Sequence, residues 1–81
     1  MPTKTKGGYS SVDQAMLGPE FSGDFEHLES FCNILQQKLG PDWEIESCTD
    51  SYNGGGGDDI PESNWTDALD VFCKQFPEAW N

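Results

Sequence analysis

The chain has 81 residues, of which 35% are hydrophobic and 12% aromatic. Fifteen Asp and Glu residues face four lysines and no arginine, which gives a formal net charge of −11. A chain of this length forms one domain at most, and its aromatic content is too high for a disordered acidic tail. The charge excludes direct binding to nucleic acid or to an anionic membrane, since both need basic residues.

The N-terminal segment is expected to contain a leader and one short helix. Residues 1–8 are small, polar or basic, and we expect a flexible leader there, followed by a single acidic globular domain over residues 9–81. Ser11 is followed three residues later by Gln14, which is the pattern of a capping box. This predicts a short helix over about residues 12–17.

Residues 24–39 carry the clearest helical pattern. Asp24 lies at the expected start, where negative charge suits the helix dipole, and Gly40 and Pro41 give a helix stop. The apolar residues recur at steps of three and four, which indicates one buried stripe formed by Phe25, Leu28, Phe31, Cys32, Leu35 and Leu39.

Residues 42–49 change to a period of two, which predicts a strand. Trp43 and Ile45 would face the core, while the acidic residues between them would face solvent. The partner of this strand stays open. It is the segment after the four glycines, the N-terminal segment, or a second copy of the chain.

The C-terminal third is expected to hold a loop and a last helix. Residues 52–59 contain four consecutive glycines, which predicts a flexible loop. The helix would then begin with Ser63 or Asn64 as its cap, with Asp67 in its first turn, and end at Pro77. Its apolar stripe comprises Trp65, Ala68, Leu69, Phe72, Cys73 and Phe76.

Together these elements predict a small α+β domain with two main amphipathic helices, a short N-terminal helix and a minimal strand or hairpin, with an all-α fold as the alternative. Trp80 would either fold back onto the core or be left for a partner. The three cysteines, Cys32, Cys48 and Cys73, are expected to be reduced thiols of a cytoplasmic protein. A disulfide between Cys32 and Cys73 is the alternative, if their helices pack together.

Groups suited to catalysis are scarce, so we expect no enzyme and no cofactor. The single histidine, His27, lies in the first predicted helix and is interpreted as a surface residue rather than a base. No residue supplies a base for any cysteine. Asp50, Asn53, Asp58 and Asp59 lie near the glycines, but their spacing is not that of a calcium loop, and no metal site is expected.

The carboxylates are the candidate functional residues. On a strand, residues two apart lie about 6.6–7 Å apart on one face, and on a helix residues three apart are neighbours. Such spacing would make rows of negative charge that a basic groove could bind. The residues expected to bind a partner are first Asp42, Glu44, Glu46, Asp58 and Asp59, and then Glu26, Glu29, Asp67 and Asp70.

Regularly spaced negative charge is also the character of a nucleic-acid backbone. In size and charge the chain resembles the small acidic inhibitors of phages and mobile elements, including anti-CRISPR and other anti-defence proteins, and acidic nuclease immunity proteins. This resemblance implies a non-catalytic inhibitor that binds a basic nucleic-acid-binding protein by mimicking DNA or RNA. The alternative is a protein-interaction module or homodimer, anchored by Trp43, Trp65 or Trp80 and completed by strand addition.

Overall fold

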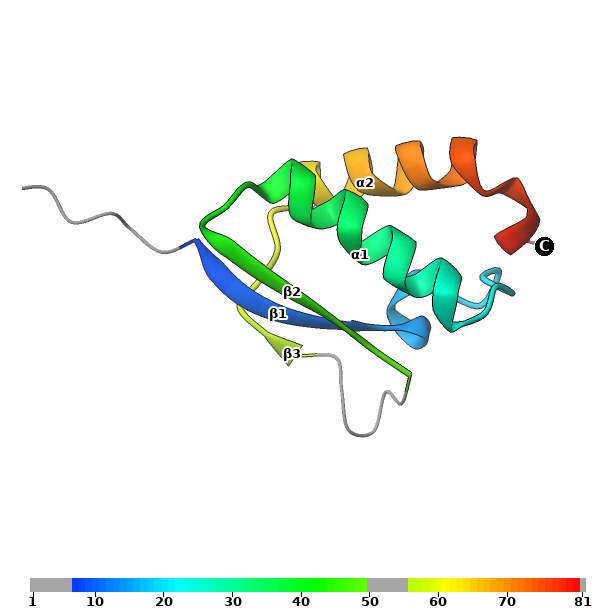
Figure 1. The fold of residues 1–81 in the computed structure, drawn as a ribbon, viewed down its shortest axis with the longest axis horizontal. Coiled ribbons are helices and arrows are strands. Elements are labelled where there is room, and N and C mark those ends of the chain that lie inside the picture. The colour runs from blue at the N-terminus through cyan, green and yellow to red at the C-terminus, as the bar shows by residue number, and fades with distance from the viewer. Residues whose placement is uncertain (1–6, 50–55, 81) are drawn as a thin grey trace, which may run out of the picture.

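The computed structural model describes residues 7–49 and 56–80. Helices and strands alternate along these residues and form an α+β domain, which confirms the predicted fold class and contradicts the all-α alternative (Figure 1). In chain order the elements are strand β1 (Gly8–Asp13), 3₁₀ helix η1 (Gln14–Leu17), helix α1 (Phe25–Leu39), strand β2 (Trp43–Cys48), strand β3 (Gly56–Gly57), helix α2 (Glu62–Gln75) and 3₁₀ helix η2 (Pro77–Ala79).

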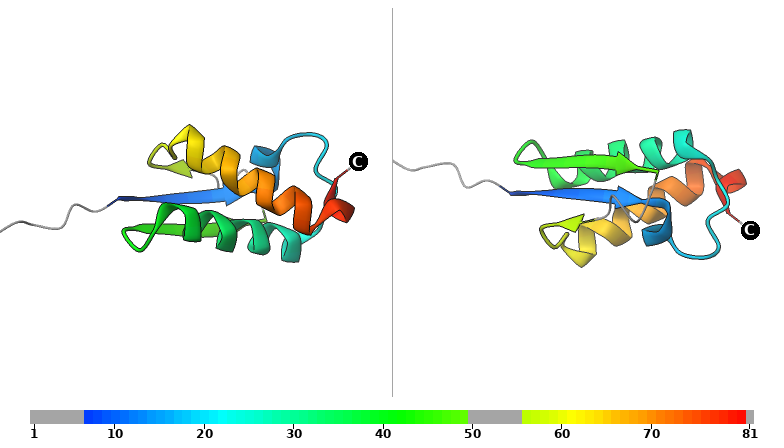
Figure 2. Two further views of the ribbon diagram at one scale, coloured as in Figure 1. Left: turned by 90° about the horizontal axis from the view of Figure 1, so that it is seen from above. Right: turned by 90° about the horizontal axis from the view of Figure 1, so that it is seen from below.

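The described strands form one three-stranded sheet with the order β2-β1-β3. β1 and β2 are parallel and are joined by a crossover through α1, whereas β3 runs antiparallel to β1. Figure 2 shows both helices on the same face of this sheet, so the described elements form two layers. The strand predicted over residues 42–49 is therefore present, and its partner is the N-terminal segment.

The prediction of a helix over residues 12–17 is wrong for residues 12 and 13, which belong to β1. Ser11 does not cap a helix; it lies in β1, opposite Glu46 of β2 and Gly56 of β3. The strand continues to Asp13, whose Oδ1 accepts a hydrogen bond from the Met16 backbone N–H, and only the single turn of η1 follows. Pairing on both sides outweighs the local capping signal, because it satisfies more backbone groups than one side-chain cap does.

The ordered fold begins earlier than the expected leader allows. Gly8 is buried and opens β1, and the backbone N–H of Gly7 donates to the Asp42 carbonyl at 3.0 Å. The Trp43 ring lies so close to this backbone that a Cβ at position 7 would be 2.2 Å from Trp43 Cδ1. Glycine is required there because the indole occupies the space of a side chain. Residues 1–6 lie outside the described residues.

The two long helices supply most of the core. The stripe predicted for α1 is confirmed, because all six of its residues are buried or pack against the core. In α2 the N-cap is Pro61, not Ser63 or Asn64, and Asp67 therefore lies beyond the first turn. The buried residues are Val12, Leu17, Leu28, Phe31, Cys32, Leu35, Ala68, Phe72 and Ala79.

The C-terminal end folds back onto this core. Trp80 forms a β-bridge with Phe21, and its ring packs edge-on against Phe21 at 5.6 Å and against Phe72 at 5.8 Å. Of the two roles expected for Trp80, the intramolecular anchor is therefore the one observed. The segment before α1 and the segment after α2 are joined by this contact.

The expected glycine loop is only partly covered by the described residues. Residues 52–55 lie outside them, and Gly56 and Gly57 form β3 rather than loop. Gly57 has a φ of 115°, and a Cβ there would be 2.3 Å from the Tyr9 carbonyl oxygen, so only glycine lets β3 approach β1. No helix in the described part of the chain is long and apolar enough to cross a membrane.

Candidate acidic binding face

The face of the sheet that the helices leave uncovered carries the clearest group of carboxylates. In the parallel register Tyr9 lies beside Glu44, and Ser11 beside Glu46. Val12 and Ile45, which alternate with these residues along the two strands, pack in or against the core. Because successive side chains of a strand point to opposite faces, those of Tyr9, Ser11, Glu44 and Glu46 point away from the helices. We call the surface formed by Tyr9, Ser11, Glu44, Glu46 and Asp58 the Tyr9 face.

Tyr9 holds this surface together through hydrogen bonds. Its hydroxyl lies 2.5 Å from Glu46 Oε1, to which it donates, and 2.7 Å from Ser11 Oγ. Its backbone N–H donates to Asp58 Oδ2 at 2.9 Å, and the Asp58 N–H donates back to the Tyr9 carbonyl. The hydrogen bond to Glu46 is the main cause that raises the pKa of Tyr9 above 10.0. Two carboxylates are thus oriented by one residue.

The row expected from Asp42, Glu44 and Glu46 is incomplete. Glu44 and Glu46 are exposed, as the alternation predicts, but Asp42 precedes β2 and is half-buried. Its backbone carbonyl accepts the N–H groups of Gly7 and Gly8. Asp42 therefore helps to attach the start of β1, and Glu44 and Glu46 are the part of the row that solvent reaches.

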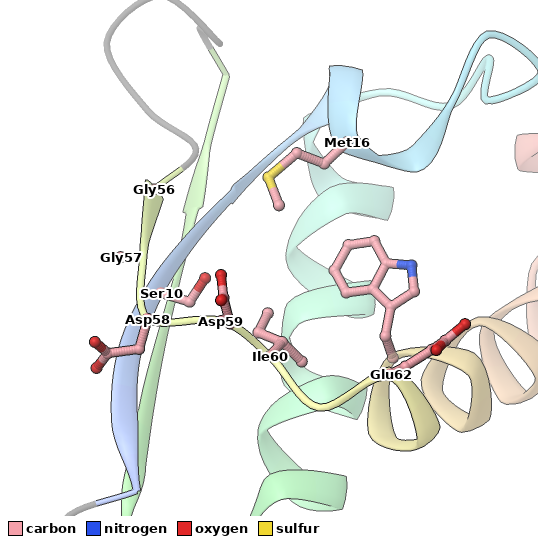
Figure 3. Close-up of a pocket in the computed structure, with 9 residues that line it drawn as sticks. Ser10, Met16, Gly56, Gly57, Asp58, Asp59, Ile60 and Glu62 are labelled. Carbon is pink, nitrogen blue, oxygen red and sulfur yellow. The ribbon is translucent and has the colours of Figure 1, made fainter.

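Asp59 and Glu62 lie beside the Tyr9 face but do not belong to it. Both line a hollow of about 360 Å³ between β1, η1 and the first turn of α2. In Figure 3 the Asp59 side chain points towards this hollow, whereas the Asp58 side chain points away from it. Asp58 also lines the hollow, but its carboxylate is turned towards Tyr9, whereas that of Asp59 is turned towards the hollow.

The remaining predicted residues are exposed on the helices, in the layer opposite the Tyr9 face. Glu26 and Glu29 lie three residues apart on α1, and Asp67 and Asp70 lie three residues apart on α2. Asp70 Oδ2 lies 3.2 Å from Lys74 Nζ, so part of its charge is compensated. The nine carboxylates do not form one continuous row, because they lie on both sides of the molecule.

His27 contributes to the start of α1. Its backbone N–H donates to Asp24 Oδ1 at 3.2 Å, and its Nδ1 lies 3.2 Å from the Asp24 backbone nitrogen, which makes a capping box. Its Nε2 lies 3.2 Å from Glu78 Oε2. These contacts fit the interpretation of His27 as a surface residue with a structural role.

The cysteines are all free, and the Cys32–Cys73 disulfide is absent. Cys32 is buried, and desolvation is the main cause that raises its pKa to about 12, so its thiol does not ionise at neutral pH. Cys73 is exposed rather than part of the apolar stripe.

Within residues 7–49 and 56–80, no group of three His, Cys, Asp or Glu side chains could hold a metal ion. Asp50 and Asn53, considered above with calcium, lie outside these residues. Comparison of the chain with protein-family models, with curated proteins and with solved structures found no match.

Proposed function

We propose that the domain is a non-catalytic inhibitor that binds a basic nucleic-acid-handling protein, of the nuclease, CRISPR or restriction type, through the Tyr9 face. The observation that carries this proposal is the set of Glu44, Glu46 and Asp58 around one tyrosine on the sheet face opposite the helices. The two lysines of the described residues, Lys38 and Lys74, lie on the helices in the other layer.

Such a face suits a groove that normally binds a nucleic-acid backbone. Glu44 and Glu46 lie two residues apart on one strand, hence about 6.6–7 Å apart, and strand pairing keeps this spacing rigid. The partner's lysine and arginine side chains would exchange phosphate contacts for carboxylate contacts. Complementary potential would also speed the encounter and make binding sensitive to salt. A cytoplasmic setting, in a host cell if a phage encodes the protein, is part of this proposal.

The test compares two charge-reversed variants of equal net charge. Glu44→Lys with Glu46→Lys alters the Tyr9 face, and Glu26→Lys with Glu29→Lys alters α1 by the same amount. Each domain is immobilised at low ionic strength and exposed to a bacterial lysate. Bound proteins are eluted first with a DNA duplex and then with salt, and are identified by mass spectrometry.

We expect the unaltered domain and the α1 variant to retain a nucleic-acid-binding protein that DNA releases. The Tyr9-face variant should lose it. One equivalent of the unaltered domain should also block DNA binding by that protein in a gel-shift assay. Retention of the same protein by the Tyr9-face variant, or bound protein that DNA fails to release, would show that the face does not mimic nucleic acid.

A further inference from the structure

The hollow beside the Tyr9 face has walls that are largely apolar. Met16 is 42% exposed, and Ile60 and Trp65 are half-buried, so apolar side chains border open space there. Trp65 packs edge-on against the buried Phe31 at 5.0 Å, which holds its ring in place. Figure 3 shows Met16 reaching into the hollow from η1 and Ile60 from the linker before α2. A methylene chain would be desolvated between them.

One wall of the hollow is polar. Ser10 is only 3% exposed as a residue, and it lines the hollow. In Figure 3 the side chains of Ser10 and Asp59 both point towards the hollow. A hydroxyl oxygen at the wall of a hollow can accept a hydrogen bond from a donor that fills the space.

The charge around the hollow has one sign. Asp58, Asp59 and Glu62 all line it, and the two lysines of the described residues do not. An apolar channel that ends at a hydroxyl and a carboxylate is complementary to a side chain with an aliphatic stem and a cationic, hydrogen-bonding end. The volume of about 360 Å³ lies at the lower end of the range for ligand pockets, which is roughly 300–1,000 Å³.

We propose that this hollow binds one arginine side chain of the basic protein partner. The guanidinium would donate to Ser10 Oγ and to the Asp59 carboxylate, and its plane would stack on Trp65. The methylene groups would pack against Met16 and Ile60. Arginine fits better than lysine because its planar fork donates to two acceptors while it stacks. The identity of the partner rests on the proposed function, but the binding of arginine itself does not.

The probe for this site is N-acetylarginine amide, with N-acetylcitrulline amide as its neutral isostere. Both are titrated into the ¹⁵N-labelled domain, and the Trp65 indole N–H and the Ser10 and Asp59 amides are followed by NMR. We expect saturable shifts of these signals with the arginine compound and none with citrulline. Asp59→Asn should weaken binding about tenfold, and Ser10→Ala roughly fivefold.

Two control variants separate this site from the Tyr9 face. Asp67→Asn removes one exposed carboxylate of α2 outside the hollow and should leave arginine affinity unchanged. Glu44→Gln with Glu46→Gln should also leave it unchanged, which keeps the pocket distinct from the proposed inhibition. Equal binding of citrulline, absence of saturable shifts, or undiminished affinity of a folded Asp59→Asn variant would overturn the arginine site, whatever the outcome of the lysate experiment.

Discussion

His27 joins two segments that are far apart in the chain. Its Nδ1 lies 2.9 Å from Asp24 Oδ1, its Nε2 lies near Glu78 of η2, and its ring packs edge-on against Phe76 at 5.6 Å. The neutral ring accepts from the Asp24 N–H and completes the capping box, whereas the protonated ring donates to the two carboxylates. Asp24 Oδ1 accepts the His27 backbone N–H in both forms, so the start of α1 keeps a cap. The neutral ring that accepts at Nδ1 already donates from Nε2 to Glu78; protonation adds the Nδ1–H donor towards Asp24 and makes both contacts charge-assisted.

These contacts predict a pH dependence of stability. The hydrogen bond to Glu78, followed by that to Asp24, raises the pKa of His27 above 6.5, although burial opposes it. A raised pKa means that its stabilisation is complete below pH 6.5 and is lost as the pH rises through the folded-state value. Glu78 has a pKa lowered from 4.5, chiefly by its own backbone N–H and then by His27, so its contribution is lost as the pH falls below 4.5. The cluster stabilises the fold most between these two limits.

The measurement is the Tm as the pH rises from 6.5 towards neutrality and slightly above. His27 is the only histidine, so the unaltered domain should lose a few degrees while His27→Gln stays nearly flat. Glu78→Gln should show an intermediate slope, because one carboxylate is left. Parallel Tm profiles for all three proteins would mean that His27 has no raised pKa in the fold.

At the scale of the elements, Gln36 of α1 protects the open edge of β2. Its Nε2 donates to the carbonyls of Trp43 and Gly40, and its Oε1 accepts from the Ile45 backbone N–H at 3.0 Å. The Trp43 carbonyl and the Ile45 backbone N–H point away from β1, towards the edge where a further strand would pair. One side chain thus occupies part of the edge that strand addition in a homodimer would use.

Gln36→Ala is therefore expected to destabilise the domain by about 1–3 kcal/mol, because several part-buried backbone groups lose partners. It should also promote self-association, since an exposed strand edge can pair with another copy. Chemical denaturation and sedimentation velocity measure the two effects. Gln37→Ala, at the exposed neighbouring position, is the matched control and should change stability by less than about 0.5 kcal/mol. Equal stability of the two variants would contradict this role of Gln36.

The elements that the sequence predicts are those stabilised by their own pattern. The helix over residues 24–39 and the strand over residues 42–49 have periodic apolar residues, and both are present almost as expected. β1 has no such pattern: its Gly, Tyr and Ser residues are held by pairing with β2 and β3. Pairing between segments far apart in the sequence leaves no local pattern that could predict β1. Because this pairing extends β1 to Asp13, Asp13 and not Ser11 caps η1.

The candidate surfaces could be predicted from the sequence only in part. The exposure of Glu44 and Glu46 follows from the alternation of one strand. The role of Tyr9 does not, because it depends on knowing which strand lies beside β2. The hollow is still harder to predict, since Ser10, Met16 and Trp65 come together only when η1 and α2 pack around β1. The one feature of the sequence that could have indicated the role of Tyr9 is a tyrosine in a chain so rich in carboxylates.

At the scale of the whole molecule, the charges are arranged at a cost to stability. Fifteen acidic residues face four lysines, and the described part of the chain shows one lysine ion pair, Lys74 with Asp70. Like charges on the Tyr9 face repel each other across a rigid strand spacing. A domain selected for stability alone would carry lysine or arginine residues among these carboxylates. The loss of stability is therefore consistent with a surface that is kept acidic for binding.

This cost predicts that neutralising the Tyr9 face stabilises the free domain. In dilute buffer, Glu44→Gln with Glu46→Gln should raise the Tm by about 2 °C. The gain should shrink towards zero in about 1 M salt, where the Debye length is only roughly 3 Å. Glu26→Gln with Glu29→Gln removes the same charge but should gain less, because Glu26 lies in the first turn of α1, where negative charge suits the helix dipole. Scanning calorimetry at both ionic strengths measures these Tm changes. A Tm gain that persists in high salt would indicate better packing and not relieved repulsion. In that case the carboxylates of the Tyr9 face would not destabilise the free domain electrostatically.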